Sequence, residues 1–438
     1  MDRFLLQSLL DWKVDALRKP LILKGARQVG KSDLAKRLGQ TFESFVEINF
    51  ETQIAAKKIF EGDLNIKVLI QSLRAYTNQL IEPGRTLLFL DEIQECENAI
   101  IALRSFKEEL PDLHVIAAGS LINFKLNKIG IPVGRVEFRY VYPLSFEEYL
   151  EAIGKSELRR YKNNPENIVA EPFHSMLLNE VRHYMWLGGM PAVVDAWIKT
   201  QDPVRCQHIQ DDILNAYRMD FAKYAKAHQL PYVERVFSNI PSQLGHKFKF
   251  THIDRELRSG PLKEALLLLE EAGIAHLVYH SSAQGFPLAA TKDDRRFKVF
   301  FFDLGLAQRL LNLSLSEFLF KPLEVQNAGA ISEQFVAQEY LAYQNVRRQA
   351  ELFYWHREAA QSNAEVDFIF VHEGQIIPAE VKSGSTGRLR SMQEFLNSHA
   401  GCSLGLKISE QMEEANQDSD PSDIKIRAIP FYQIQHWA

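Results

Sequence analysis

The chain has 438 residues, of which 46% are hydrophobic and 24% are charged, and its formal net charge is −5 at pH 7. This length predicts two to four domains, because single cores rarely grow beyond about 250–300 residues. The mildly acidic net charge does not indicate a nucleic-acid surface over the whole chain, so a nucleic-acid site would have to lie on local basic patches. No apolar stretch reaches the ~18 residues that a membrane span needs, and Cys96, Cys206 and Cys402 form no disulfide or zinc pattern. We therefore expect a soluble, cytoplasmic protein without membrane contact.

A glycine-bounded loop follows the first apolar strand, which is predicted at residues 21–23. The loop fits the pattern G-x-x-x-x-G-K-[ST], whose backbone N–H groups cradle nucleotide phosphates. Lys31 is expected to reach the β- and γ-phosphates, and the Ser32 hydroxyl is expected to bind Mg²⁺. The helix that follows offers its positive end to the same anions. The expected ATP-binding residues are Gly25, Ala26, Arg27, Gln28, Val29, Gly30, Lys31, Ser32 and Asp33.

The second nucleotide motif is the apolar strand of residues 86–90, which ends in Asp91 and Glu92. A strand that is apolar throughout is typical of a buried parallel sheet. We predict that Asp91 holds Mg²⁺ through water and that Glu92 is the catalytic residue that polarises the attacking water. The alternative, an acidic cap between a strand and a helix, does not account for the phosphate loop upstream.

Two further residues are candidates for the phosphate site. Ser120 follows an apolar strand that begins at His114, and it is either a sensor of the γ-phosphate or an ordinary turn serine. Arg135 either acts as a catalytic arginine, in its own chain or in a neighbouring subunit, or is an exposed structural arginine. A homo-oligomer is therefore left open.

Residues 145–230 are predicted to form a helical lid on an ATPase core of residues 1–144. Apolar residues recur at three-to-four spacing in SFEEYLEAI, HSMLLNEVRHYMWLGG and QHIQDDILNAYRMDFAKYA. Gly188, Gly189 and Pro191 predict a turn within this region.

The segments KGARQVGKS, LLFLDEIQ, AAGS, YPLSFEEYL and LGGMPAVVDAW resemble those of a family of prokaryotic AAA-like P-loop ATPases whose C-terminal region has no known function. The resemblance runs along nearly the whole chain. It implies an α/β fold that binds ATP with Mg²⁺, in which a helical lid follows the ATPase core. It also implies a winged-helix module and then a restriction-endonuclease-like (PD-(D/E)XK-type) α/β domain.

Residues 231–325 contain three short predicted helices and then a β-hairpin, which is the order of a winged-helix module. Basic residues on the later helices and on the hairpin make residues 251–298 a candidate DNA surface. The glutamates of KEALLLLEEAGI would repel phosphates, so a protein partner is the alternative. The basic residues are Arg255, Arg258, Lys263, Lys292, Arg295, Arg296 and Lys298.

Residues 326–438 contain a second candidate catalytic group. Asp367 lies among apolar residues of one predicted strand, and Glu380 and Lys382 share a face of the next, because side chains two apart point the same way. In restriction-endonuclease-like folds, which the resemblance implies, Asp367 and Glu380 would bind a divalent ion and Lys382 would orient the attacking water. Glu333 on the preceding helix is a further candidate metal ligand. A plain ion pair, or a site that grips a nucleic-acid end without cutting it, is the alternative.

These motifs favour Mg²⁺-dependent ATP binding and hydrolysis that control a nucleic-acid-engaging C-terminal domain, with nuclease activity left open. The alternative is an ATP-dependent switch or scaffold that binds a protein partner and carries an inactive nuclease-like fold. A small-molecule kinase fits less well, because Glu92 beside Asp91 suits the activation of water.

Overall fold

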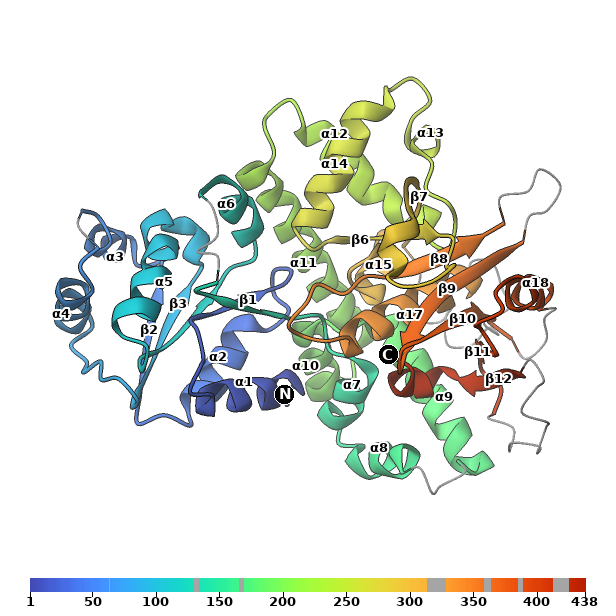
Figure 1. Cartoon of the computed structure of the whole chain (residues 1–438), viewed down its shortest axis with the longest axis horizontal. Coiled ribbons are helices and arrows are strands. Elements are labelled where there is room, and N and C mark those ends of the chain that lie inside the picture. The colour runs from blue at the N-terminus through green and yellow to red at the C-terminus, as the bar shows by residue number, and fades with distance from the viewer. Residues whose placement is uncertain are drawn as a thin grey trace.

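The computed structural model describes residues 1–62, 64–129, 134–164, 169–312, 328–357, 364–384, 389–412 and 425–438. The chain is an α/β protein with a five-stranded and a seven-stranded sheet. In Figure 1 the first sheet lies at the left, the strands of the second lie towards the right in yellow, orange and red, and helices lie between them. The predicted boundary at residues 325 and 326 falls outside the described residues.

The first sheet is parallel and has the order β2-β3-β4-β1-β5. Every residue of β3 and β4 is buried, because helices cover both faces of these central strands. The strands predicted from residues 21, 86 and 114 are confirmed. The five strands are β1 (Leu21–Lys24), β2 (Ser44–Asn49), β3 (Thr86–Asp91), β4 (His114–Ala118) and β5 (Glu137–Tyr140).

Two separate apolar clusters cover the two faces of this sheet. Leu87 and Phe89 of β3 pack in the cluster that contains α1 and α2, whereas Leu88 and Leu90 pack in the cluster that contains α4 and α5. This alternation is the one expected of a strand, whose side chains point to opposite faces in turn. The helices around the sheet are α1 (Leu5–Val14), α2 (Lys31–Gly39), α3 (Ile54–Ile59), α4 (Ile66–Thr77), α5 (Glu97–Glu109) and α6 (Ile122–Ile129).

A helical region follows, as its apolar spacing predicted. Its first helix begins with a capping box between Ser145 and Glu148. The buried carboxylate of Glu339, from the C-terminal half, accepts a hydrogen bond from the Phe146 N–H at 3.0 Å and so binds the positive end of the same helix. The helices are α7 (Phe146–Ala152), α8 (Ser156–Asn163), α9 (Glu171–Leu187), α10 (Pro191–Thr200) and α11 (Pro203–Tyr224).

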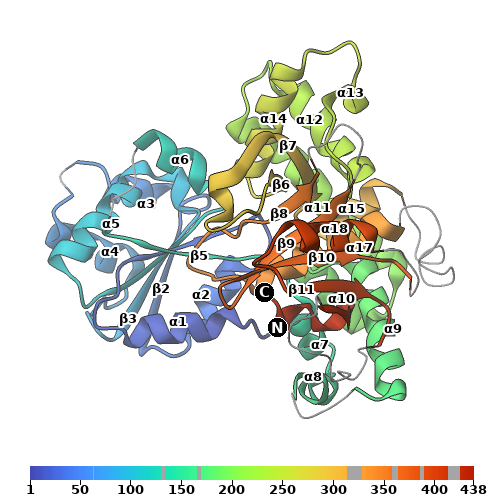
Figure 2. The ribbon, with the colours of Figure 1, turned by 45° about the vertical axis from the view of Figure 1, so that its right-hand side comes forward.

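Three helices and an antiparallel hairpin come next, as predicted, but the hairpin is not an independent wing. Its first strand, β6, pairs in parallel with β8, so that Tyr279 lies opposite Phe353. The hairpin therefore extends the C-terminal sheet, and the predicted division into residues 231–325 and 326–438 cuts across one sheet. Figure 2 shows the helices gathered at one end of this sheet, next to the hairpin. The elements are α12 (Leu230–Asn239), α13 (Phe250–Ile253), α14 (Ser259–Glu271), β6 (Ala275–Ser281), β7 (Lys292–Phe301) and α15 (Leu304–Leu310).

The second sheet has the order β12-β11-β10-β9-β8-β6-β7. One face packs against α17 through residues such as Phe335 and Phe368, and the other face packs against α18 through residues such as Val366 and Phe395. The remaining elements are α17 (Ala328–Tyr343), β8 (Phe353–His356), β9 (Glu365–His372), β10 (Gln375–Val381), α18 (Arg390–Ser398), β11 (Leu404–Ser409) and β12 (Lys425–Pro430).

One apolar core joins the two halves of the chain. It starts at Leu5 in α1, passes through the helical region and the second sheet, and ends at Trp437. The N-terminal and C-terminal halves thus share buried surface and do not fold around separate centres. None of the helices in the described ranges has the length and apolar composition that crossing a membrane requires.

Glycines allow the close approach of three backbones at the centre of the molecule. A Cβ atom at Gly189 would lie 2.2 Å from the Leu144 carbonyl oxygen, and one at Gly305 would lie 2.1 Å from the Leu187 carbonyl oxygen. The Gly189 N–H donates to the buried Asp303 carboxylate at 2.7 Å. This junction, which we call the glycine junction, holds the segment before α7, the α9–α10 turn and the start of α15 together.

We predict that Gly305→Ala destabilises the protein by about 1–3 kcal/mol, because its methyl group would overlap a buried carbonyl that cannot move away. Gly260→Ala is the matched control, since a Cβ atom there meets nothing within 4 Å. Urea unfolding of the two variants measures both effects. Equal stability of the two variants would contradict the tight contact at the glycine junction.

Candidate functional site

The phosphate loop leaves β1 and enters α2 at the carboxyl edge of the first sheet. A Cβ atom at Gly25 would lie 2.2 Å from the Val141 carbonyl oxygen, and Gly30 has a φ of +99°. A side chain at either position is therefore excluded by contact or by backbone strain. Between them, Gln28 adopts a φ of +64° and Val29 is buried, so the loop has one well-defined shape.

Lys31 lies under this loop with only 7% of its surface exposed. Its ammonium donates to the carbonyl oxygens of Gly25 at 3.0 Å and of Ala26 at 2.7 Å. Burial lowers the pKa of Lys31 to about 8, although the charges of Glu92 and Asp91 oppose this shift. The side chain is thus held at the loop by weak acceptors that a stronger anion can replace.

Ser32 and Asp91 meet directly, as expected of two groups that share a metal ion. The Ser32 hydroxyl donates to Asp91 Oδ2 at 3.0 Å, and the Asn49 amide donates to the same oxygen at 3.2 Å. Hydroxyl and carboxylate oxygens are the ligands that Mg²⁺ prefers, so these residues fit a magnesium ion. Asn49 was not predicted, although its position at the carboxyl end of β2, beside β3, is a usable signal. Asp33 instead faces outward and pairs with Arg37 at 2.8 Å.

Glu92 is held by a residue that the sequence analysis missed. Its backbone has a φ of +48°, and the Gln94 amide donates to its carboxylate at 2.5 Å. Burial raises the pKa of Glu92. A Cβ atom at Gly119 would lie 2.1 Å from Gln94 Oε1, so the glycine before Ser120 leaves the space that Gln94 occupies.

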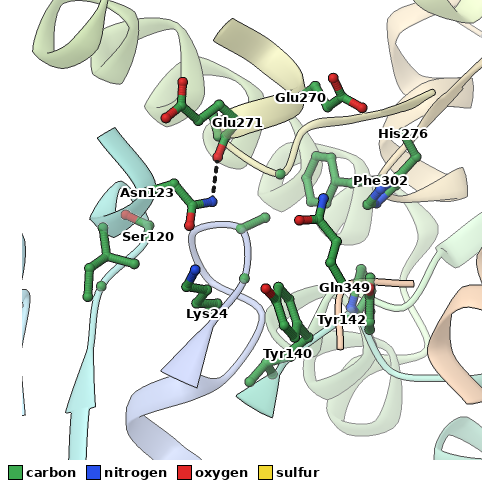
Figure 3. Close-up of a pocket in the computed structure, with 18 residues that line it drawn as sticks. Lys24, Ser120, Asn123, Tyr140, Tyr142, Glu270, Glu271, His276, Phe302 and Gln349 are labelled. Carbon is green, nitrogen blue, oxygen red and sulfur yellow. Dashed lines mark hydrogen bonds between the residues drawn. The ribbon is translucent and has the colours of Figure 1, made fainter. Parts of the chain in front are cut away.

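Ser120 lies at the end of β4 and is buried. It lines a cavity of about 50 Å³ that also includes Lys24 and His276. Figure 3 shows that Lys24, Ser120 and Asn123 line this cavity on the side of the first sheet, and that Glu271 and His276 face them from the second half. The Asn123 amide donates to the Glu271 carbonyl oxygen at 3.0 Å and closes the contact between the two parts.

Helix α11 contacts the phosphate loop at Arg27. The Arg27 guanidinium binds both carboxylate oxygens of Asp220 at 2.6 and 2.5 Å, and the Tyr217 hydroxyl donates to the Arg27 carbonyl oxygen at 2.6 Å. Lys223 contacts Asp220 at 3.1 Å and Glu51 at 3.0 Å. We call these side chains the Arg27 network. It connects the loop with α11 and with the segment after β2.

Arg135 does not join the phosphate site of its own chain. Glu137, two residues later, pairs with Leu21 at the start of β1, whereas Tyr140 pairs with Lys24 at its end. Arg135 therefore lies at the amino edge of the sheet, opposite the phosphate loop. It is partly exposed and forms an ion pair with Glu108 at 3.0 Å.

The C-terminal candidate residues form a second group, on β9, β10 and α17. Asp367 Oδ2 accepts a hydrogen bond from the Val381 N–H at 2.9 Å, and Glu380 accepts one from the Lys382 ammonium at 2.6 Å. Asp367 and Glu333 also contact the ammonium of Lys298, at 3.6 and 3.1 Å. Lys298 is fully buried, so the expectation that it contacts DNA phosphates is wrong.

The described residues contain no group of three or more histidine, cysteine, aspartate or glutamate side chains arranged to hold a metal ion. The carboxylates of Glu333 and Asp367 are instead occupied by Lys298. Lys298 thus contacts two of the three carboxylates that the sequence analysis assigned to a divalent ion.

The comparisons with known proteins give three family matches along the chain. Residues 17–150 match the family described as an AAA domain. Residues 178–317 and 328–433 match two domains of unknown function, DUF8612 and DUF4143. None of the curated protein sequences matches this chain.

Three solved structures that resemble the chain are distant from it in sequence. The Walker-type ATPase of Pyrococcus abyssi has 14% identity and a TM-score of 0.47, over 71% of this chain and 95% of that one. The ORC1 protein of Aeropyrum pernix, solved in complex with DNA, has 13% identity and a TM-score of 0.27, over 70% of this chain and 91% of that one. A STAND protein of Pyrococcus horikoshii with a tetratricopeptide repeat sensor has 10% identity and a TM-score of 0.29, over 78% of this chain and 47% of that one. From the family match and the first sheet together, we conclude that residues 17–150 form an AAA-like ATPase domain.

Proposed function

We propose that the chain hydrolyses ATP with Mg²⁺ and that its nucleotide state controls the C-terminal half. The observation that carries this proposal is the convergence of the phosphate loop, the Ser32–Asp91 pair and the Glu92–Gln94 pair at one edge of the first sheet. All the groups that hydrolysis of a phosphoanhydride requires are thus present in one chain, except a cationic residue from outside the loop.

Each group has a distinct role in the proposed reaction. Lys31 exchanges its two carbonyl acceptors for the β- and γ-phosphate oxygens, to which the N–H groups of the loop also donate. Ser32 and Asp91 would hold the Mg²⁺ ion, which neutralises charge on the phosphates when it is bound. Glu92 accepts a proton from the attacking water, and Gln94 fixes the orientation of the Glu92 carboxylate.

The Arg27 network is the proposed route from the nucleotide to the rest of the chain. A triphosphate places several negative charges beside Arg27 and competes with Asp220 and Glu51 for it. Release of Asp220 frees α11, whose Asp211 forms an ion pair with Arg309 of α15 at 2.7 Å. Gly273 lies beside the phosphate loop, since an added Cβ atom there would be 3.4 Å from the Ala26 nitrogen.

We further propose that the C-terminal half engages nucleic acid. The succession of helix α17, antiparallel strands β8, β9 and β10, helix α18 and parallel strand β11 supports the restriction-endonuclease-like fold expected from the sequence. Exposed basic residues of the middle region support electrostatic contact with phosphates. These residues are Arg255, Arg258, Lys263, Arg295 and Arg296.

The second candidate is an ATP-dependent switch that binds a protein partner and cleaves nothing. Two observations favour it. Arg235 of α12 binds Asp254 beside the proposed DNA surface, and the Lys298 ammonium, which was expected to contact phosphates, is buried among carboxylates. Both reduce the positive charge that a nucleic acid would meet.

Lys31→Ala should abolish ATP hydrolysis, because the ammonium that binds the transferred phosphoryl group is lost. Glu92→Gln should retain ATP binding and lower turnover by about 10²–10⁴-fold, as expected for loss of a general base. Phosphate release and nucleotide binding measured on the same preparations separate the two effects. Hydrolysis by Lys31→Ala at the rate of the parent protein would reject the site.

ATP affinity should fall about tenfold per pH unit above pH 8, because the free protein must then take up a proton at Lys31 before it binds the anion. Below pH 8 Lys31 already carries its charge, so the affinity should level off. Lys31→Arg is the control, since a guanidinium stays protonated and should remove the slope. Isothermal titration calorimetry between about pH 7 and about pH 9.5 measures the affinity of both proteins for ATP. An unchanged slope in Lys31→Arg would assign the dependence to another group.

DNA binding by the parent protein should weaken steeply with salt, with a log–log slope of about −0.9 per neutralised phosphate. Arg255→Ala combined with Arg295→Ala should reduce the magnitude of this slope by about 2. Lys199→Ala is the matched control, because that lysine is exposed and paired with Asp195 on α10. Fluorescence anisotropy over a salt series measures all three. Binding that is absent or insensitive to salt favours the protein-partner candidate.

A further inference from the structure

The C-terminal sheet contains a lysine that solvent does not reach. Lys298 lies on β7 and is 0% exposed. Its ammonium is 2.9 Å from Glu365 Oε1, 3.1 Å from Glu333 Oε2 and 3.6 Å from Asp367 Oδ1. The ring of Tyr354 lies on a further side, with its centroid 5.5 Å away. We call the lysine and its three carboxylates the Lys298 cluster.

The Lys298 cluster surrounds one ammonium group with carboxylate oxygens from α17 and β9, at 2.9, 3.1 and 3.6 Å. A buried charge with three partners is compensated, whereas removal of the ammonium would leave the carboxylates to repel one another.

The same carboxylates are the ones that a metal-dependent nuclease would need. Asp367 offers one oxygen to Lys298 and the other to the Val381 N–H. Glu333 accepts a hydrogen bond from the Lys298 ammonium. Glu380 accepts one from the Lys382 ammonium through Oε1, whereas its Oε2 is buried without a hydrogen-bond partner. A magnesium ion requires oxygen ligands at about 2.1 Å in an octahedral arrangement. A magnesium ion could bind Asp367 and Glu333 together only if it displaced the buried ammonium from the oxygens that this ammonium contacts.

We propose that Lys298 permanently replaces, with an ammonium group, the divalent cation of a restriction-endonuclease-like centre. The C-terminal sheet then carries an ion cluster in place of a metal centre and is not a metal-dependent nuclease. This inference goes beyond the proposed function, because it concerns the chemistry of the second half and does not depend on ATP hydrolysis.

The Lys298 cluster also has a mechanical role. It joins three elements that are distant in the sequence, since Lys298 lies on β7, Glu333 on α17, and Glu365 and Asp367 on β9. The hairpin is thereby fixed to the helix and strand of the C-terminal sheet. If α14 and β6 moved relative to the phosphate loop, the whole C-terminal sheet would move with them.

Manganese binding tests the proposal, measured by electron paramagnetic resonance without nucleotide. An Asp91→Ala background removes the metal ligand of the ATP site, so that any remaining Mn²⁺ reports on the C-terminal half. In this background we expect no stoichiometric Mn²⁺ site. Stoichiometric Mn²⁺ that is lost on adding Asp367→Asn would overturn the proposal. Because nucleotide is absent, this result stands whether or not the chain hydrolyses ATP.

Lys298→Met, which keeps an unbranched stem and removes the charge, provides the converse test in the same background. It should bind Mn²⁺ at least tenfold more tightly than its parent, and Mn²⁺ should raise its melting temperature but not that of the parent. Adding Asp367→Asn should abolish both gains. A folded Lys298→Met variant that gains no Mn²⁺ would show that the carboxylates are not a vacated metal site. If Lys298→Met does not fold, the proposal is judged from Mn²⁺ binding by Asp91→Ala with and without Asp367→Asn.

Discussion

The nucleotide site depends on one constraint, which is the parallel order of the first sheet. Strands that are apolar on both faces are stable only between two layers of helices, and β3 and β4 are buried along their whole length. The order β2-β3-β4-β1-β5 makes β1, β4 and β3 consecutive neighbours. The segments that follow these strands therefore open at the same edge, although long helical segments separate them in the sequence. The phosphate loop, Asp91 with Glu92, and Ser120 meet for this reason.

The phosphate loop is held by two kinds of contact that respond differently to a bound anion. Gly25 and Gly30 fix the backbone of the loop through its shape, and a ligand does not change that. Arg27 is held by the carboxylates of Asp220 and Glu51, and an anion competes with carboxylates for a guanidinium. The loop thus keeps its form while its attachment to α11 can change, which is the property that a nucleotide switch requires.

Local patterns predicted most of the first sheet and much of its site. The phosphate loop and the acidic end of β3 are short, contiguous motifs, and the structure brings them together. Arg135 was harder to interpret because β5 is only four residues long and was not predicted, so the edge of the sheet on which Arg135 lies could not be known. Gln94 was missed because its position depends on the space left by Gly119, which is distant in the sequence.

The second half was predicted less well because its structure rests on non-local pairing. The sequence predicts a hairpin at β6 and β7, but only the pairing of β6 with β8 shows that the hairpin belongs to a larger sheet. That pairing decides which face of β7 is covered and therefore buries Lys298. Asp367, Glu380 and Lys382 were assigned to the correct strands, but the partner of Asp367 comes from a segment about seventy residues earlier, by a contact that no local rule of strand alternation specifies.

The shared apolar core, from Leu5 to Trp437, has a consequence for how such a chain can evolve. Proteins built from separately folded units can exchange a unit by recombination, because few contacts cross the boundary. Here an exchange of the C-terminal half would leave buried positions of helices α7 to α11 without matching side chains. The ATPase and its C-terminal half are therefore expected to be inherited together, with compensating substitutions on the two sides of their common interior.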